Sequence, residues 1–272
     1  MNLTKKLVLL VMATALCAAP AVAEQIGGCR VDNSPADSRV ACPVISSCPA
    51  PVGDIGAMAF DGAYLWVGDF SGWARLSKVD PATCTVVSQI TLTDGNVGGV
   101  AWDGTAVWVC YEQAAVIQRI DPASGAVLTS YNSPGHGVAD PDASGLTWDG
   151  TYLWHADYGL DMIYKLDPQT GAVLQSFPSP GPCPGDIEYD AASGALVVAD
   201  CIRREFILLD PATGAEISSC GFPSVGHWGV TIAGGLVWSG NAANSTLKAL
   251  DVLQGVVATD GVTWSTVKAL YN

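Results

Sequence analysis

The sequence predicts an all-β fold, a β-propeller built from four-stranded antiparallel blades. Three observations carry this prediction: one motif returns five times, its period lies in the forties, and each copy consists of short apolar segments separated by turn residues. An aspartate marks the same point of every copy, at positions 80, 121, 167, 210 and 251, so the steps are 41, 46, 43 and 41 residues. Repeats of this length made of short strands are typical of propeller blades. No helical periodicity or capping pattern recurs between the copies, which argues against a β-α-β architecture.

The first half of each copy predicts a tight hairpin. A short apolar segment, residues 58–60 in the first copy, runs into Asp-Gly at 61, and the same dipeptide returns at 103 and 149. Asp-Gly between two strands favours the positive φ angles of a tight turn. The segment after the turn, first seen as Leu65-Trp66-Val67, is rich in the aromatic and β-branched residues that suit a pleated sheet. We therefore expect an inner strand A followed by a strand B.

The second half of each copy predicts strands C and D. Asp-Pro ends the third segment at 80, 121, 167 and 210. The aspartate side chain caps a turn there and proline fixes φ, so strand C is expected to turn into an outer strand D. Tryptophans that recur in register, at 66, 108, 154 and 238 and at 102 and 148, are expected to form the core between blades.

The two ends of the chain predict how the ring closes. Residues 30–32 and 39–40 imitate the C-to-D hairpin of the other copies, and residues 261–264 imitate strand A. A last blade assembled from both chain ends would leave no exposed edge strand. We expect six blades, the sixth shared between residues 28–45 and the C-terminal segment. Five blades are the alternative, because only 13 residues separate Asp251 from Trp264, whereas the corresponding spacing is 22 after Asp80, Asp167 and Asp210.

Residues 1–23 are predicted to be a secretory signal peptide. Lys5 and Lys6 precede an apolar run, and Ala21-Val22-Ala23 forms a cleavage site before Glu24. Residues 24–272 are then expected to form a single propeller domain of a secreted or periplasmic protein. No later segment is long and apolar enough to predict a membrane span.

Cysteine usage agrees with an oxidising compartment. Eight cysteines remain after the predicted signal peptide, at 29, 42, 48, 84, 110, 183, 201 and 220. An even number in a secreted chain favours disulfides, and no Cys-x-x-Cys motif points to a zinc-thiolate site. Cys183 precedes strand A of its blade and Cys201 follows strand B. Because an antiparallel hairpin brings those two ends together, we expect a Cys183–Cys201 bond and leave the other pairings open.

The charge of the chain narrows the classes of partner. The formal net charge is −14, and it becomes −16 once Lys5 and Lys6 leave with the signal peptide. Phosphate backbones would be repelled, so a nucleic-acid partner is not expected. Cations, a small cationic molecule, an uncharged glycan or a protein remain compatible with this charge.

Polar residues gather where the B strands are expected to end, on one face of the ring. The positions three beyond the tryptophan register hold Asp69, Tyr111, Asp157, Asp200 and Asn241. His136 and His227 fall in D-to-A loops and His155 near the end of a B strand, all expected on the same face. Oxygen and imidazole donors suit a divalent cation such as calcium, or a transition metal. The predicted metal ligands are Asp69, Asp157, Asp200, Asn241, His136, His155 and His227. The alternative is that the aspartates cap turns and each histidine makes a local hydrogen bond.

Aromatic residues outside the core register predict a ligand-binding platform on that face. Trp73 lies in a B-to-C loop and Trp228 follows His227 at the start of a strand A. With Tyr111 and Tyr158, and with Phe70 nearby, they suit a sugar or a quaternary ammonium group. Simple packing of the loops is an equal alternative.

Two phrases of the sequence resemble a known superfamily. Residues 148–157, W-D-G-T-Y-L-W-H-A-D, and residues 164–171, Y-K-L-D-P-Q-T-G, resemble the extracellular bacterial repeats of the NHL, YVTN and quinoprotein amine dehydrogenase beta chain-like propellers. The resemblance covers residues 54–260 and implies a propeller with a binding or surface role. Some relatives are lyases or lactone hydrolases with a metal in the channel. Chain length is similar to that of propeller-type glutaminyl cyclases, but their glutamate-glycine strand starts are missing, since Ile55, Val97 and Pro184 precede the corresponding glycines.

The sequence contains no motif that names a reaction. It has no Gly-x-Ser-x-Gly elbow, phosphate loop, dinucleotide fingerprint or His-Glu-x-x-His. We therefore expect a non-catalytic binding module whose ligand meets the acidic face. The alternative function is a metal-dependent hydrolase or lyase, in which a cation polarises a carbonyl and a histidine moves protons.

Overall fold

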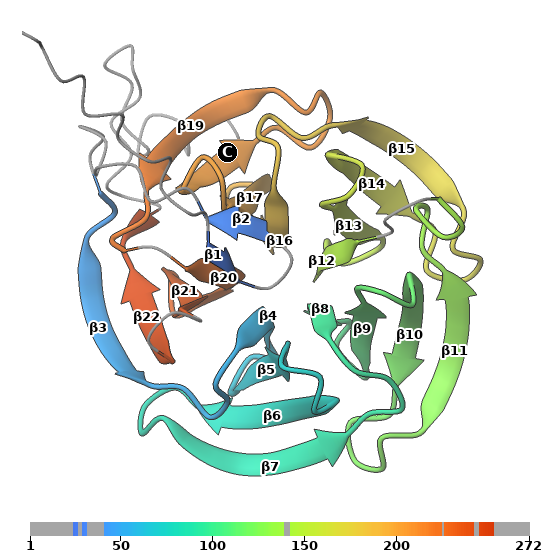
Figure 1. Ribbon diagram of the computed structural model, residues 1–272, viewed down its shortest axis with the longest axis horizontal. Coiled ribbons are helices and arrows are strands. Elements are labelled where there is room, and N and C mark those ends of the chain that lie inside the picture. The colour runs from blue at the N-terminus through green and yellow to red at the C-terminus, as the bar shows by residue number, and fades with distance from the viewer. Residues whose placement is uncertain are drawn as a thin grey trace, which may run out of the picture.

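A computed structural model describes residues 24–26, 29–31, 41–138, 142–224, 226–241 and 245–252. Within these residues the chain forms a ring of five four-stranded antiparallel sheets, a β-propeller (Figure 1). The predicted fold class is confirmed. The predicted signal peptide, residues 1–23, and the predicted strand at 261–264 lie outside the described residues.

Each blade runs from an inner strand A to an outer strand D. Blade 1 consists of β4 (Ile55–Phe60), β5 (Leu65–Asp69), β6 (Arg75–Asp80) and β7 (Thr85–Thr91). Blade 2 consists of β8 (Val97–Trp102), β9 (Val107–Tyr111), β10 (Val116–Ile120) and β11 (Val127–Asn132). Blade 3 consists of β12 (Ala143–Trp148), β13 (Leu153–Asp157), β14 (Met162–Leu166) and β15 (Val173–Pro178). Blade 4 consists of β16 (Pro184–Asp190), β17 (Ala195–Asp200), β18 (Glu205–Leu209) and β19 (Glu216–Gly221). Blade 5 consists of β20 (His227–Ala233), β21 (Leu236–Asn241), β22 (Thr246–Leu250) and β3 (Val44–Pro49).

The expectation of six blades was wrong, and the five-blade alternative holds for the described residues. The N-terminal segment supplies one strand of the last blade, not two, because β3 pairs with β22 as its outer strand D. Residues 30–32 were predicted as a strand C, but Arg30 and Val31 belong instead to β2 (Cys29–Val31). It pairs with β1 (Glu24–Ile26) in a separate two-stranded sheet. The idea of a last blade assembled from distant parts of the chain is thus confirmed, with residues 44–49 as the closing strand.

Disulfides fasten this closing strand to both of its neighbouring blades. Cys42, just before β3, bonds to Cys220 of blade 4, and Cys48 within β3 bonds to Cys84 of blade 1. The Cα atoms of the two pairs are 5.5 Å and 6.2 Å apart, within the usual range for disulfides. The outer edge of blade 5 is therefore held on each side by a covalent bond.

The core lies between blades, as the tryptophan register predicts. Trp66, Trp108, Trp154 and Trp238 are each buried in a different apolar cluster at a blade junction. The inner strands approach one another closely around the axis, since a Cβ atom at Gly145 would lie only 2.6 Å from the Ile187 amide nitrogen. A side chain at this position would therefore clash with the backbone of the neighbouring inner strand.

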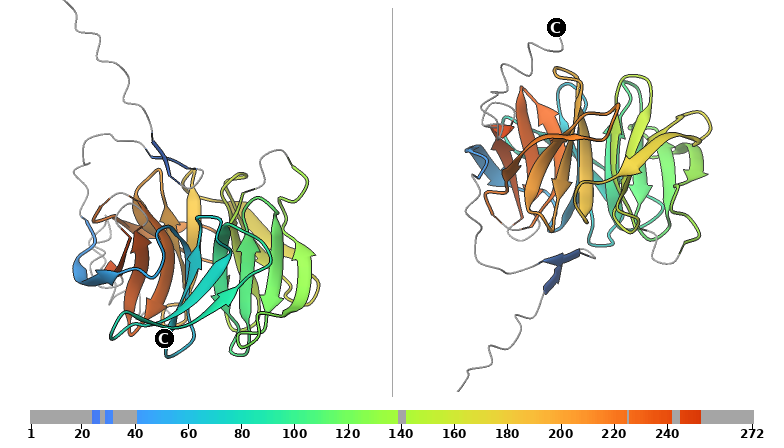
Figure 2. Two further views of the ribbon diagram at one scale, coloured as in Figure 1. Left: turned by 60° about the horizontal axis from the view of Figure 1, so that its bottom comes forward. Right: turned by 90° about the horizontal axis from the view of Figure 1, so that it is seen from above.

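The turns divide the disc into two faces, which Figure 2 shows from the side. We call the face with the A-to-B and C-to-D turns the hairpin face, and the face with the B-to-C turns and D-to-A loops the rim face. On the hairpin face, Asp61, Asp103 and Asp149 repeat one arrangement. One carboxylate oxygen accepts the amide hydrogens two and three residues on, and the other accepts the indole N–H of the following strand B. Lys78, Arg119 and Lys165 pair with these same carboxylates.

Candidate functional site

On the rim face, two sets of equivalent residues surround the axis. The residue after each strand B donates its amide hydrogen to the carbonyl of the residue before strand A. The pairs are Phe70 with Asp54, Glu112 with Asn96, Tyr158 with Asp142, and Cys201 with Cys183. The blades therefore present different chemistry at one geometric position. Apart from this shared backbone hydrogen bond, the repeat imposes no side chain here.

Aromatic side chains from several blades meet at this end of the axis. The rings of Phe70 in blade 1 and Trp228 in blade 5 are stacked, with centroids 6.3 Å apart. Trp228 also packs with the Cys183–Cys201 disulfide of blade 4 and with Tyr158 of blade 3. The predicted bond between Cys183 and Cys201 is confirmed, with Cα atoms 5.4 Å apart. Three residues of the predicted aromatic platform, Phe70, Tyr158 and Trp228, are thus brought together.

Carboxylates occupy the other side of the same end. Glu112 of blade 2 is buried, and the Asn96 amide donates a 3.4 Å hydrogen bond to it. Burial is the main cause that raises the pKa of Glu112 to about 7, and the negative charges of Asp142 and Asp54 contribute to this value. Burial and the charge of Asp69 also raise the pKa of Asp54. These carboxylates from blades 1, 2 and 3 are close enough to disfavour one another's ionisation.

Asp157 completes the group and has an unsatisfied oxygen. Its side chain is fully buried, and its Oδ1 accepts a 3.0 Å hydrogen bond from the Leu160 amide. Its Oδ2 is buried and has no hydrogen-bond partner among the described residues. Burial raises the pKa of Asp157 to about 6, and the charges of Asp142 and Asp161 add to this effect. A buried carboxylate oxygen without a donor is costly.

We call the residues gathered here the axial rim. They are Asp54, Phe70, Asn96, Glu112, Asp142, Asp157, Tyr158 and Trp228. Sequence reasoning missed Glu112, because it followed the last residue of each strand B, the position of Tyr111 and Asp157, and Glu112 is the residue after it. Shifting the register by one position would have found it, next to Tyr111.

The other predicted strand-end residues make structural contacts. Asp69 accepts hydrogen bonds from Ser71 and forms a 2.7 Å ion pair with Arg75. Asp200 accepts the amide hydrogens of Cys183, Ile202 and Arg203. The Asn241 amide donates to the Ser224 hydroxyl at 3.1 Å. For Asp69 and Asp200, the turn-capping interpretation describes the contacts that the structure contains.

The three histidines do not converge. His136 is exposed and its Nδ1 lies 3.3 Å from the Ala114 carbonyl oxygen. His155 is buried, with Nδ1 3.0 Å from the Gly145 carbonyl oxygen, and burial lowers its pKa to about 4. His227 is buried between the hydroxyls of Ser239 and Ser224, and burial followed by the charge of Lys248 lowers its pKa to about 3.

The described residues therefore give no geometric support to the predicted metal site. Within them, no group of three or more His, Cys, Asp or Glu side chains is arranged to hold a metal ion. Of the seven predicted ligands, only Asp157 belongs to the axial rim. Nothing in this part of the chain favours a metal-dependent hydrolase or lyase over other functions.

Two predicted aromatic residues lie away from the platform. Tyr111 is buried in the apolar cluster between blades 1 and 2, and burial raises its pKa to about 12. Trp73 is 70% exposed, and the Arg75 guanidinium lies 5.7 Å from its ring centre. The first is a core residue, and the second is a surface residue of a turn.

Deeper along the axis, Asp186 joins three blades. This fully buried residue of blade 4 accepts hydrogen bonds from the Val230 amide of blade 5 at 2.8 Å and from the Met58 amide of blade 1 at 3.3 Å. Burial raises its pKa well above the usual range, against the effect of these amide hydrogens. Asp186 is therefore a link between the inner strands beneath the axial rim.

Comparison with solved structures identifies the same fold in other proteins. Glutaminyl cyclase from Myxococcus xanthus is similar with a TM-score of 0.66 and 14% sequence identity, covering 79% of this chain and 97% of that chain. The WD40 propeller domain of Doa1 is similar with a TM-score of 0.49 and 13% identity, over 72% of this chain and 63% of that one. Virginiamycin B lyase from Staphylococcus aureus gives 0.47 and 16%, over 71% and 64%. At these identities the likeness shows the fold alone.

Sequence comparisons are silent on function. No protein-family model matches the chain, and no curated protein matches it. Among the described residues, none forms a helix long and apolar enough to cross a membrane. The three disulfides of the described residues are consistent with a secreted or periplasmic protein.

Proposed function

We propose that this chain is a secreted or periplasmic binding module that holds an ammonium group of its ligand at the axial rim. The observation that carries the proposal is the buried Oδ2 atom of Asp157, which has no donor in the part of the chain that the structure describes. An ammonium group supplies the missing hydrogen bonds or, if quaternary, the missing positive charge. The negative charge of the chain adds long-range attraction for cations.

The composition of the rim fits this class of ligand. Carboxyl groups from three blades lie at the same end of the axis as the stacked rings of Phe70 and Trp228. Aromatic faces attract ammonium groups through the ring quadrupole. Because Glu112 and Asp157 have raised pKa values, about 7 and about 6, ligand binding is expected to release protons and to strengthen as pH rises.

The test uses tetramethylammonium and n-butylammonium chloride as probes, with tert-butanol as a neutral control of similar shape. Isothermal titration at pH 8, at constant ionic strength, should give saturable millimolar binding for the ammonium probes and none for tert-butanol. Affinity should fall about tenfold at pH 5, as the rim carboxyls take up protons.

Variants locate the binding. Asp157→Asn keeps the Oδ1 acceptor and removes the charge, so it should abolish binding of the ammonium probes. Asp121→Asn changes a carboxylate that caps a turn on the hairpin face and should leave binding unchanged. Absence of ammonium binding to the unaltered protein, or binding that survives Asp157→Asn, would overturn the proposal.

A second candidate function is proton-transfer catalysis at the same rim. Carboxyl groups with pKa values near 6 and 7 are suited to general acid and base roles near neutral pH. The Myxococcus xanthus neighbour is a glutaminyl cyclase, which supplies a substrate for the test. If the chain is a binding module, a peptide with N-terminal glutamine should release no ammonia above background. Ammonia release that Glu112→Gln abolishes would establish the catalytic alternative.

A further inference from the structure

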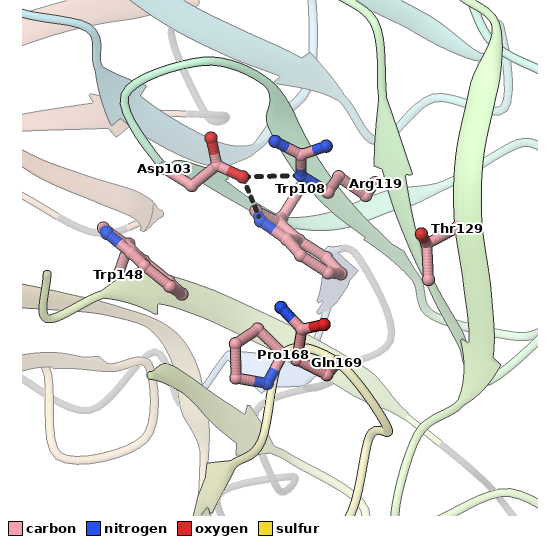
Figure 3. Close-up of a pocket in the computed structure, with 7 residues that line it drawn as sticks. All are labelled: Asp103, Trp108, Arg119, Thr129, Trp148, Pro168 and Gln169. Carbon is pink, nitrogen blue, oxygen red and sulfur yellow. Dashed lines mark hydrogen bonds and ion pairs between the residues drawn. The ribbon is translucent and has the colours of Figure 1, made fainter. Parts of the chain in front are cut away.

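A separate cavity lies between blades 2 and 3, on the hairpin face. Its volume is about 370 Å³, and it is lined by Asp103, Trp108, Arg119, Thr129, Trp148, Pro168 and Gln169 (Figure 3). None of these residues belongs to the axial rim. The volume lies in the lower part of the range for small-molecule sites, enough for a ligand of one ring.

One side chain distinguishes this cavity from the junction of blades 3 and 4. At the junction of blades 3 and 4, Gln175 occupies the same position of strand D as Thr129, since Gln175 pairs with Lys165 and Thr129 pairs with Arg119. The Gln175 amide donates hydrogen bonds of 3.0 Å and 3.1 Å to the carbonyl oxygens of Pro211 and Ala212 in the neighbouring blade. Thr129 cannot reach the matching turn at Pro168 and Gln169, so the space stays open.

The charges in the cavity are already paired. Asp103 Oδ2 accepts hydrogen bonds from Arg119 Nε at 2.7 Å and from Trp108 Nε1 at 2.9 Å. Its Oδ1 accepts the amide hydrogens of Thr105 and Ala106 and the Thr105 hydroxyl. Burial opposes the ionisation of Asp103. The hydrogen bonds that it accepts, first among them the one from Arg119, nevertheless lower its pKa to about 2. The aspartate has no acceptor capacity left for a cation, and the arginine charge is neutralised.

The groups that remain available are neutral and polar. The Thr129 hydroxyl and the Gln169 amide make no side-chain hydrogen bond within the described part of the chain. Gln169 lies beside the Pro168 ring, and in this view the Trp108 indole lies between Thr129 and Trp148 (Figure 3). Trp108 is buried in the core, so the apolar lining that a ligand can contact is that of the half-buried Trp148 and Pro168. Such rings beside uncharged donors and acceptors match a pyranose, which has apolar ring faces and equatorial hydroxyls.

We propose that this cavity binds a single neutral sugar ring, as a second site independent of the axial rim. The Trp148 indole contacts a face of the ring, and Thr129, Gln169 and Arg119 Nη1 hydrogen-bond its hydroxyls, while Arg119 Nη2 donates to the Thr105 hydroxyl at 2.7 Å. The equivalent junction between blades 3 and 4 does not bind sugar, because Gln175 fills it.

The test measures sugar binding by the mature protein. Titration with the methyl glycosides of glucose, galactose, mannose and N-acetylglucosamine, followed by tryptophan fluorescence and by saturation-transfer NMR, should give saturable millimolar binding for at least one. Sodium acetate is titrated in parallel. Binding of acetate and of no glycoside would show that Arg119 acts as an anion site and would overturn the proposal, as would the absence of all binding.

Thr129→Gln is the decisive variant, because it installs the side chain that closes the neighbouring junction. It should reduce sugar affinity at least tenfold without lowering the melting temperature. Gln169→Ala, at an exposed turn position, should weaken affinity several-fold and keep the fold. Asp157→Asn at the axial rim should leave sugar binding unchanged. Sugar binding that survives Thr129→Gln would place the sugar elsewhere and refute the assignment.

Discussion

The two faces of the ring use the same kind of residue in opposite ways. On the hairpin face, Asp61, Asp103 and Asp149 repeat one set of contacts, and both oxygens of each carboxylate are satisfied by amide, indole and cationic donors. On the rim face, Asp54, Glu112 and Asp157 stand at unlike positions and have raised pKa values. One face holds its carboxylates in the ionised state, and the other resists their ionisation.

This difference teaches how to interpret a repeated sequence. A residue that recurs in every blade answers a need that every blade has, such as ending a strand or satisfying amide hydrogens. A residue that breaks the repeat has no such duty. Where several such residues converge and remain unsatisfied, a ligand is the natural explanation for their cost. Three sets of substitutions test this difference between the two faces.

The largest effect is expected for a tryptophan of the repeat. Trp154 is 1% exposed, and its ring packs 6.1 Å from that of Phe177, so Trp154→Ala should lower the free energy of unfolding by ~4 kcal/mol. Trp73, which departs from the repeat, is 70% exposed, so Trp73→Ala should change stability by less than ~0.5 kcal/mol. Denaturant titration measures both. Equal losses would show that the register of a tryptophan does not report its burial.

The sequence predicted the features that recur in every blade. Turn dipeptides, strand order and the four core tryptophans follow from local chemistry that each blade shows separately, so five copies reinforce one prediction. Blade number depended on residues 30–32, which resemble a strand C, but Arg30 and Val31 instead pair with β1. A three-residue pattern of alternating polarity fits many strand partners, and the chain ends contained no second copy to decide among them.

The second effect contrasts an aspartate of each face. Asp149→Ala removes the acceptor for the Thr151 and Tyr152 amides and leaves the Trp154 indole N–H without its partner, which should cost ~2 kcal/mol. Asp157→Asn keeps the oxygen that accepts from Leu160 and removes a buried charge, so stability should fall by no more than ~0.5 kcal/mol. Thermal unfolding at pH 8 compares them. A loss at Asp157 as large as that at Asp149 would make it a structural turn residue.

The candidate site was predicted only in part, for a reason of geometry. Strand ends on one face could be located from the turn spacing, which correctly brought Asp157, Tyr158 and Trp228 to one place. Which way a side chain points at the end of a strand depends on a single residue of register. Tyr111 therefore faces the core while Glu112 faces the axis. The histidines were misleading because each is satisfied or buried locally, which single residues in a sequence do not reveal.

The smallest effect is a pH dependence that belongs to the rim face. Glu112 has a pKa of about 7 in the folded protein against 4.5 ordinarily, so between these values the folded state binds more protons than the unfolded state. Stability attributable to this group is therefore present at low pH and is lost as pH rises from about 4.5 to about 7. If the whole pKa shift of Glu112 contributed, it would change the free energy of unfolding by ~3 kcal/mol. We expect ~1 kcal/mol, because solvent and side-chain relaxation reduce the effect.

Glu112→Gln isolates this contribution, because the Gln carbonyl oxygen still accepts the hydrogen bond of the Asn96 amide and carries no charge. At pH 4 the variant and the unaltered protein should be equally stable, since Glu112 is then mostly protonated in both the folded and unfolded states. At pH 8 the variant should be more stable by ~1 kcal/mol, measured by urea unfolding at fixed ionic strength. Asp121→Asn on the hairpin face should show no such gain, because that carboxylate is stabilised in its ionised form by Ser124 and Ala123. A gain at Asp121, or none at Glu112, would remove the electrostatic difference between the two faces and with it the main reason to place a cationic ligand at the axial rim.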